Sequence, residues 1–135
     1  MRQPISRMNP PTLPNAALAG YSQITTVEPG RLAYISGQVA RLPNGGPAPQ
    51  SLTEQAKLVA ANAMAALTAI DATPRDIVMA RIYMVDLTTE RLEEMMPHIL
   101  AMFDGVQPSL TGVGVAALAG PDLQIEMELI VRMPD

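Results

Sequence analysis

The clearest pattern in the chain is an alternation of apolar and polar positions near its C-terminus. Over residues 123–131, every second side chain is apolar and the positions between them include Glu126 and Glu128. Residues 77–85 alternate in the same way, with Arg81 on the more polar face. Because successive side chains of a strand point to opposite faces, both segments are predicted to be strands with one face in the core.

More strands are predicted on either side of these two. Residues 21–27 and 32–36 are rich in β-branched and aromatic side chains, and the Glu-Pro-Gly-Arg sequence of residues 28–31 suits a type II turn between them. We therefore expect a β-hairpin, continued by a short strand over residues 37–42. Residues 112–118 are predicted to form another strand, joined by a loop to the last one.

The first helix is predicted to begin after Ser51. Ser51 and Glu54 have the spacing of a capping box, in which each residue satisfies a free N–H group at the helix start. The segment that follows is rich in alanine and contains neither glycine nor proline before Pro74. So many alanines indicate a helix that lies very close to a sheet.

A second helix is predicted to begin at Thr88 or Thr89 and to end at Gly105. Its apolar side chains recur at helical spacing, and a threonine is a favourable residue at a helix N-terminus. Pro97 lies inside the segment and predicts a kink or a broken turn. Met95 and its neighbouring methionines are interpreted as core residues, with an apolar cleft wall as the alternative; these are Met95, Met96 and Met102.

The order of elements predicts an α+β fold in which two helices cover one face of a mixed β-sheet. A proline-rich extended arm over residues 1–20 precedes these elements. The other face of the sheet is expected to carry polar side chains among apolar neighbours, namely Arg81, Tyr83, Glu126 and Glu128. Such a face can be buried by self-association, which would place a site between subunits.

Composition narrows the classes of function. The 135 residues, 48% of them hydrophobic, predict a single domain over residues 1–135, and the net charge of −4 disfavours nucleic-acid binding. The absence of cysteine and the single histidine, His98, exclude thiolate and multi-histidine metal sites, and no cofactor is expected. Because the chain has no long apolar run, we expect a soluble cytoplasmic protein with no membrane partner.

Several segments spread over the chain carry a resemblance to a known family. They include Gly20-Tyr21, Ile35-Ser36-Gly37-Gln38, Asp86-Leu87, Pro108-Ser109-Leu110-Thr111-Gly112-Val113, Leu118 and Ile125-Glu126-Met127. With these segments the chain resembles the RidA (YjgF) family, whose fold is similar to that of a bacterial chorismate mutase. The resemblance implies a homotrimer with a small-molecule ligand in each cleft between subunits, and hydrolysis of reactive enamines and imines derived from amino acids.

One position departs from the family pattern. Family deaminases carry an arginine two residues after the signature proline, where it is thought to hold the carboxylate of the substrate; here that position is Leu110. A leucine cannot form the paired, charge-assisted hydrogen bonds of a guanidinium group. The expected substrate is therefore an enamine, imine or related molecule without a free carboxylate.

The resemblance implies a catalytic role for Glu126, which falls on the signature glutamate thought to position the attacking water. A carboxylate suits this task, although an exposed structural carboxylate is the alternative. Arg81 either replaces the missing guanidinium or, as we favour, pairs across the sheet with Glu126 or Glu128. Glu128 is interpreted as a structural or interface charge.

Five further residues match positions of the family's cleft. Tyr21 and Ser36 offer hydroxyl groups to a ligand or a water, and Gln38 can bond to the backbone beside a bulge. Thr111 and Gly112 stand where family members offer a small side chain and a backbone amide. Tyr21 is equally suited to packing on a neighbouring subunit.

Two hypotheses follow from these residues. The first is an enzyme that adds water to a small reactive enamine or imine. The alternative is a trimer without catalysis, which binds a small molecule or acts through protein contacts. A nuclease, an activity attached to some family members, is disfavoured by the acidic charge and by the lack of a histidine pair.

Overall fold

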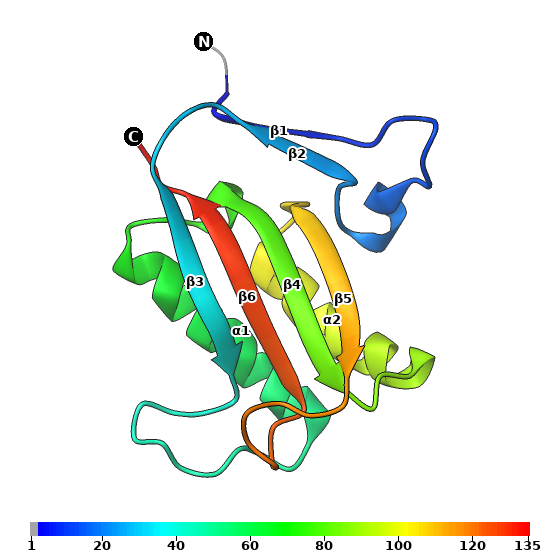
Figure 1. Cartoon of the computed structure of the whole chain (residues 1–135), viewed down its shortest axis with the longest axis vertical. Coiled ribbons are helices and arrows are strands. Elements are labelled where there is room, and N and C mark those ends of the chain that lie inside the picture. The colour runs from blue at the N-terminus through cyan, green and yellow to red at the C-terminus, as the bar shows by residue number, and fades with distance from the viewer. Residues whose placement is uncertain (1–2) are drawn as a thin grey trace.

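The computed structural model describes residues 3–135 and arranges them as a four-stranded sheet, a separate two-stranded ribbon and two long helices (Figure 1). In chain order the elements are β1 (Ile5–Met8), the 3-10 helix η1 (Ala16–Ala19), β2 (Ile24–Val27), β3 (Leu32–Val39), α1 (Leu52–Ala69), the 3-10 turn η2 (Pro74–Asp76), β4 (Ile77–Val85), α2 (Thr89–Phe103), β5 (Ser109–Val115) and β6 (Ile125–Arg132).

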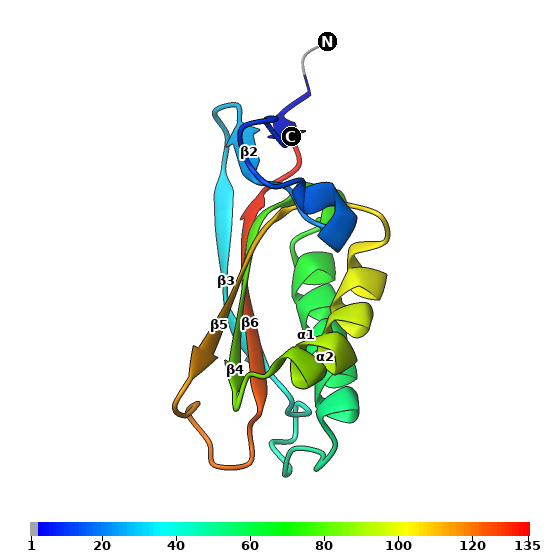
Figure 2. The ribbon, with the colours of Figure 1, turned by 90° about the vertical axis from the view of Figure 1, so that its right-hand side faces the viewer.

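The main sheet is mixed and has the strand order β3-β6-β4-β5. β6 pairs antiparallel with both of its neighbours, whereas β4 and β5 run parallel. Both helices lie against the same face of this sheet (Figure 2). The predicted α+β architecture, with two helices on one face of a mixed sheet, is therefore confirmed.

The core lies between the helices and the sheet, and the alternation seen in the sequence accounts for it. On β6 the apolar positions Met127, Leu129 and Val131 are almost completely buried, whereas Glu126 and Glu128 are only partly covered. Small side chains let α1 approach the sheet closely, and the buried alanines are Ala56, Ala60 and Ala63. No helix within residues 3–135 is long and apolar enough to cross a membrane.

Both helices begin at predicted N-caps, although the return bond from the Glu54 side chain to the Ser51 N–H is not found within residues 3–135. The Ser51 side chain accepts a hydrogen bond from the Glu54 N–H at 3.1 Å, and Thr88 accepts one from the Arg91 N–H at 3.1 Å. α2 continues through Pro97 without a broken turn. Its last residue is Phe103 rather than the predicted Gly105, because Asp104 already adopts the left-handed conformation (φ 50°) that closes the helix.

The predicted hairpin between residues 21–27 and 32–36 is wrong. β2 pairs with β1, which lies inside the segment expected to be an extended arm, and β3 pairs with β6. Residues 28–31 instead cross from the ribbon to the sheet. The almost fully buried guanidinium of Arg132 holds this crossing by donating to the Glu28 and Pro29 carbonyl oxygens at 3.1 and 2.9 Å.

The strand boundaries also differ from those predicted. Residues 37–39 belong to β3 rather than to a separate strand, and the pairing with β6 shifts register between Ile35 and Gln38. β5 begins at Ser109, three residues before its predicted start, because Ser109 is tied to the ribbon by a 2.7 Å hydrogen bond with Thr25. The register shift beside Gly37 matches the expected bulge.

Asp122, in the loop before β6, is hydrogen-bonded to the loop that follows β3. Arg41 donates to both carboxylate oxygens, with Nη2 2.7 Å from Oδ1 and Nη1 3.1 Å from Oδ2, and the Ala48 N–H donates to Oδ2 at 2.9 Å. These bonds, that of Arg41 first, lower the pKa of Asp122 from an ordinary 3.8 to about 2.

We expect this carboxylate to make the fold sensitive to acid. Because the pKa of Asp122 is lower in the folded chain, its ionised form stabilises the fold above about pH 4, and this contribution disappears as the pH falls toward about 2. The Asp122→Asn variant lacks this contribution. Thermal melts between about pH 4 and pH 2 should therefore show a larger loss of Tm for the natural sequence than for the variant, and equal losses would contradict the assignment.

Candidate active site

The residues expected to form the site lie on both faces of the sheet. Leu110 pairs with Ala80 and Gly112 with Ile82, and both positions lie on the face of the sheet that is turned toward the helices. Their neighbour Thr111 pairs with Arg81 on the face away from the helices. We call this second face the open face; it also carries Tyr83, Glu126 and Glu128.

Glu128 is engaged by two neighbours on the open face. The Tyr83 hydroxyl donates to Glu128 Oε1 at 2.5 Å, and Arg81 Nη1 lies 3.5 Å from the same oxygen. The hydrogen bond to Glu128 is the main cause that raises the pKa of Tyr83 above its ordinary value. Arg81 therefore pairs with one of the two carboxylates that the sequence indicates.

Glu126 lies beside this cluster and faces a different environment. Within residues 3–135 its carboxylate has neither a hydrogen bond nor an ion-pair partner, although Glu126 is paired across the strands with Tyr83, which bonds to Glu128 instead. Its side chain lies directly against the backbone of Gly37, where a Cβ atom would overlap Glu126 Oε1. Because Gly37 has no side chain, the Glu126 carboxylate can occupy this position.

Ser36 and Gln38 lie next to this glycine at the bulge of β3. The Gln38 side chain donates from Nε2 to the Ser36 carbonyl oxygen at 3.0 Å, so it bonds to the local backbone. Ser36 itself is exposed. These two residues and Glu126 form one group, on the half of the sheet made by β3 and β6.

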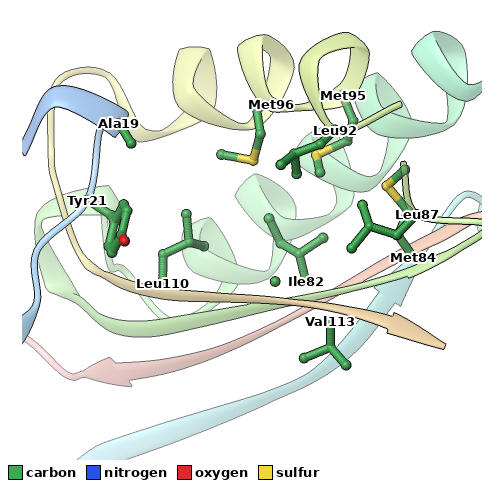
Figure 3. Close-up of a pocket in the computed structure, with 11 residues that line it drawn as sticks. Ala19, Tyr21, Ile82, Met84, Leu87, Leu92, Met95, Met96, Leu110 and Val113 are labelled. Atoms are coloured by element: carbon green, nitrogen blue, oxygen red, sulfur yellow. The ribbon is translucent and has the colours of Figure 1, made fainter. Parts of the chain in front are cut away.

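The second group surrounds an apolar cavity of about 280 Å³ between α2 and the helix-facing side of β4 and β5 (Figure 3). Tyr21, Leu110 and Gly112 line it, and Leu110 and Tyr21 lie side by side at one end. The remaining lining residues are Ala19, Ile82, Met84, Leu87, Leu92, Met95, Met96 and Val113. We call this space the apolar cavity.

The described chain does not bring the two groups together. Strand β4 lies between β5 and β6, so Thr111 and Glu126 are separated by two strand spacings, roughly 10 Å. In addition, Leu110 faces the helices, whereas Glu126 and Arg81 face the opposite side. The predicted residues therefore form two half-sites within the described chain.

Part of the cavity was not expected from the sequence. Met95 and Met96 line it, as the alternative interpretation of a cleft wall allows, while Met102 is buried in the core. Ala19 and Leu92 also line it and were not predicted to be site residues, and Leu87, which lies in a segment of the family resemblance, was given no role at the site. The available signal was the apolar spacing on the second helix, which does not distinguish a core side chain from one that borders a cavity.

His98 is remote from both half-sites, in a shallow groove between α1 and α2 that also includes Lys57. Within residues 3–135, no three side chains of histidine, cysteine, aspartate or glutamate gather in a way that could hold a metal ion. The two half-sites offer a carboxylate, hydroxyl groups and backbone amides.

Comparison with known proteins identifies the family. The sequence model of the family described as Endoribonuclease L-PSP matches residues 12–133. The chain therefore belongs to this family, which is the YjgF/RidA family of the earlier resemblance. The comparison with curated proteins gave no match.

Solved structures of the same family have the same fold. YyfB from Yersinia pestis, a Rid family protein of unknown function, is 33% identical with a TM-score of 0.90, over 96% of this chain and 99% of that chain. Mmf1 from yeast is 25% identical with a TM-score of 0.69, over 98% of both chains. Rv2704 from Mycobacterium tuberculosis, a YjgF/YER057c/UK114 family member, has a TM-score of 0.65 at 23% identity, over 95% of this chain and 98% of that chain.

Proposed function

We propose that the protein hydrolyses a small, uncharged enamine or imine in a cleft between the subunits of a homotrimer. The observation that carries this proposal is the unpaired carboxylate of Glu126, held in place by Gly37 while its neighbour Glu128 is engaged. A carboxylate without a partner in the described part of the chain is available to orient a water molecule and accept its proton.

The reaction is a hydration followed by loss of an amine. The water oxygen bonds to the imine carbon, one water proton reaches the nitrogen, and the resulting carbinolamine breaks its C–N bond to give a carbonyl compound and an amine. An enamine with an N–H group first tautomerises to the imine, gaining a proton on carbon and losing one from nitrogen. Glu126 orients the water and carries the proton, so that no oxidant, reductant or metal is needed.

The division into two half-sites supports a site made by two subunits. Tyr21 and Leu110 lie near the β5 edge, and Glu126 lies on the β6 half of the open face. The open face also exposes large apolar side chains, including Leu32 at 43%, Tyr34 at 73% and Val113 at 39%. Burial of this face against another subunit would remove that apolar surface from water and bring a β5 edge close to Glu126.

We expect the protein to be a homotrimer in solution. Light scattering at micromolar concentration should give three times the chain mass of 14.4 kDa. The measurement should be repeated at high salt, because an interface that buries apolar surface is not weakened by screening in the way that surface ion pairs are. A stable monomer would remove the basis for a shared cleft.

We also expect little activity on imines formed by dehydration of serine or threonine. These carry a carboxylate, and Leu110 cannot supply the paired hydrogen bonds that the family's arginine is thought to make. Loss of such a charged partner costs about 2 kcal/mol or more in binding, or at least roughly thirtyfold. A coupled assay with freshly generated imine, beside an arginine-containing relative, measures the difference; equal rates would contradict the expectation.

A binding protein without catalysis is the second candidate, and the apolar cavity favours it. A cavity of about 280 Å³ is near the lower end of the range of ligand sites, about 300–1,000 Å³. This candidate expects ligand binding with no turnover of any imine. RNA cleavage, which the family description names, is less well supported because the chain has a net charge of −4 and a single histidine.

A further inference from the structure

The apolar cavity combines a buried floor with an exposed rim. Ile82 and Met84 form its floor on β4 and Met95 lines it from α2, and all three are at most 2% exposed. Leu87 and Leu92 are large aliphatic residues of its lining, yet they are 37% and 38% exposed. The cavity is therefore open to solvent on one side, and a molecule can enter it without disrupting the core.

The absence of a side chain at Gly112 keeps part of this space empty. A Cβ atom built on Gly112 would meet no atom within 4 Å, and the backbone there is not in the left-handed region. A larger residue would thus fit the strand and project into unoccupied space. This distinguishes Gly112 from Gly37, where the neighbouring Glu126 already fills the corresponding space.

The lining sets the chemical class of the ligand. Among residues 3–135, no charged side chain lines the cavity, and the Tyr21 hydroxyl is the one polar side-chain group in its lining. A carboxylate would lose its hydration there without gaining a cationic partner, which is strongly unfavourable. An apolar group has no strong hydration to lose, and the methionine side chains of α2 can adjust to its shape.

We propose that the apolar cavity binds an uncharged aliphatic or alicyclic substituent of the ligand, and that Leu110 and Gly112 determine this specificity. This inference rests on the proposed function for its connection to catalysis, but it concerns binding alone and can be tested alone. The Tyr21 hydroxyl, at the end of the cavity beside Leu110, hydrogen-bonds to the polar end of the same molecule (Figure 3).

The test uses two probes of nearly equal shape, cyclohexanecarboxamide and cyclohexanecarboxylate, titrated at pH 7 against the whole protein. Methyl NMR of the methionines reports where each probe binds. We expect the amide to shift the methyl signals of Met95 and Met96 and to bind at least tenfold more tightly than the carboxylate. Equal affinity, tighter carboxylate binding, or no shift at these two methyl groups would overturn the proposal.

Two variants and one control connect the binding to the named residues. Gly112→Val should weaken amide binding at least tenfold, while Gly46→Val, in a loop where a Cβ meets only Asn44 at 3.6 Å, should leave it unchanged. Leu110→Arg should reverse the preference, so that the carboxylate binds more tightly. Thermal melts of each variant check folding; amide binding retained in folded Gly112→Val, or an unchanged preference in folded Leu110→Arg, would contradict the assignment.

The outcome separates this inference from the proposed function. Amide binding in the cavity without turnover of any imine would leave the inference standing and remove the enzymatic proposal. Turnover of uncharged imines together with no amide binding, or with full activity in Gly112→Val, would overturn the inference and leave the enzymatic proposal standing.

Discussion

Replacing Glu126 with glutamine is expected to lower the turnover of an uncharged imine by about a hundredfold or more, with little change in ligand affinity. Glutamine keeps the shape of the side chain and much of its hydrogen bonding, but it cannot accept the proton of the attacking water. Steady-state kinetics of kcat and KM, measured beside probe binding and light scattering on the same preparation, test this expectation.

Glu128→Gln is the matched control, because it makes the same chemical change two residues away on the same face. Glu128 is occupied by Tyr83 and Arg81, so its loss should change turnover only a few-fold. Unchanged turnover of Glu126→Gln in an intact trimer would refute the catalytic assignment. Dissociation of the trimer would identify Glu126 as an ion-pair partner of a neighbouring subunit, since Arg81 already pairs with Glu128 in its own chain.

Gly37→Ala is expected to displace the Glu126 carboxylate without changing residue 126 itself. The added methyl group would occupy the position of Glu126 Oε1 and force the carboxylate to move, while the charge of the chain stays the same. Turnover should fall as it does for Glu126→Gln. Because positions 37 and 126 would then act on one group, the double variant should be little worse than either single variant.

The two central strands and both helices are predictable from the sequence, because burial on one face leaves a period of two or of 3.6 in the side chains. The pairing of the strands is less accessible. β1 has only four residues and lies between Pro4 and Pro10, so it is too short to show a pattern and too close to prolines to suggest a strand. The turn sequence at residues 28–31 favours a hairpin when it is considered alone. In the structure, the buried Arg132 binds the carbonyl oxygens of this segment, which connects the ribbon to the main sheet.

The candidate site is likewise only partly predictable from the sequence. The alternation of β4 and β6 predicts that Arg81 faces a carboxylate, and it does. That Leu110 faces the helices follows from the pairing of β5 with β4, which a single strand's pattern does not contain. The cavity likewise depends on the distance between α2 and the sheet and on the missing side chain of Gly112, neither of which is visible in spacing alone.

Gln55 illustrates a residue whose importance appears only in three dimensions. It lies on α1 among alanines and is completely buried. Its side-chain Nε2 donates to the Pro49 and Asp122 carbonyl oxygens at 2.7 and 2.8 Å, and its Oε1 accepts from the Gln124 N–H at 2.9 Å. Both amide N–H groups and the amide oxygen of Gln55 thus help to hold the loop that leads into β6 and Glu126.

Gln55→Leu is expected to reduce the free energy of unfolding by about 3 kcal/mol or more, because buried groups left without a partner cost about 1–3 kcal/mol each. Leucine fills the space but leaves the Gln124 N–H and two carbonyl oxygens unpaired. Tm should fall by roughly 10 °C or more at fixed protein concentration. Lys57→Leu, on the exposed side of the same helix, serves as the control and should change the stability by no more than about 0.5 kcal/mol. Urea denaturation followed by circular dichroism measures both variants, and similar stabilities would contradict the role of Gln55 in holding the loop.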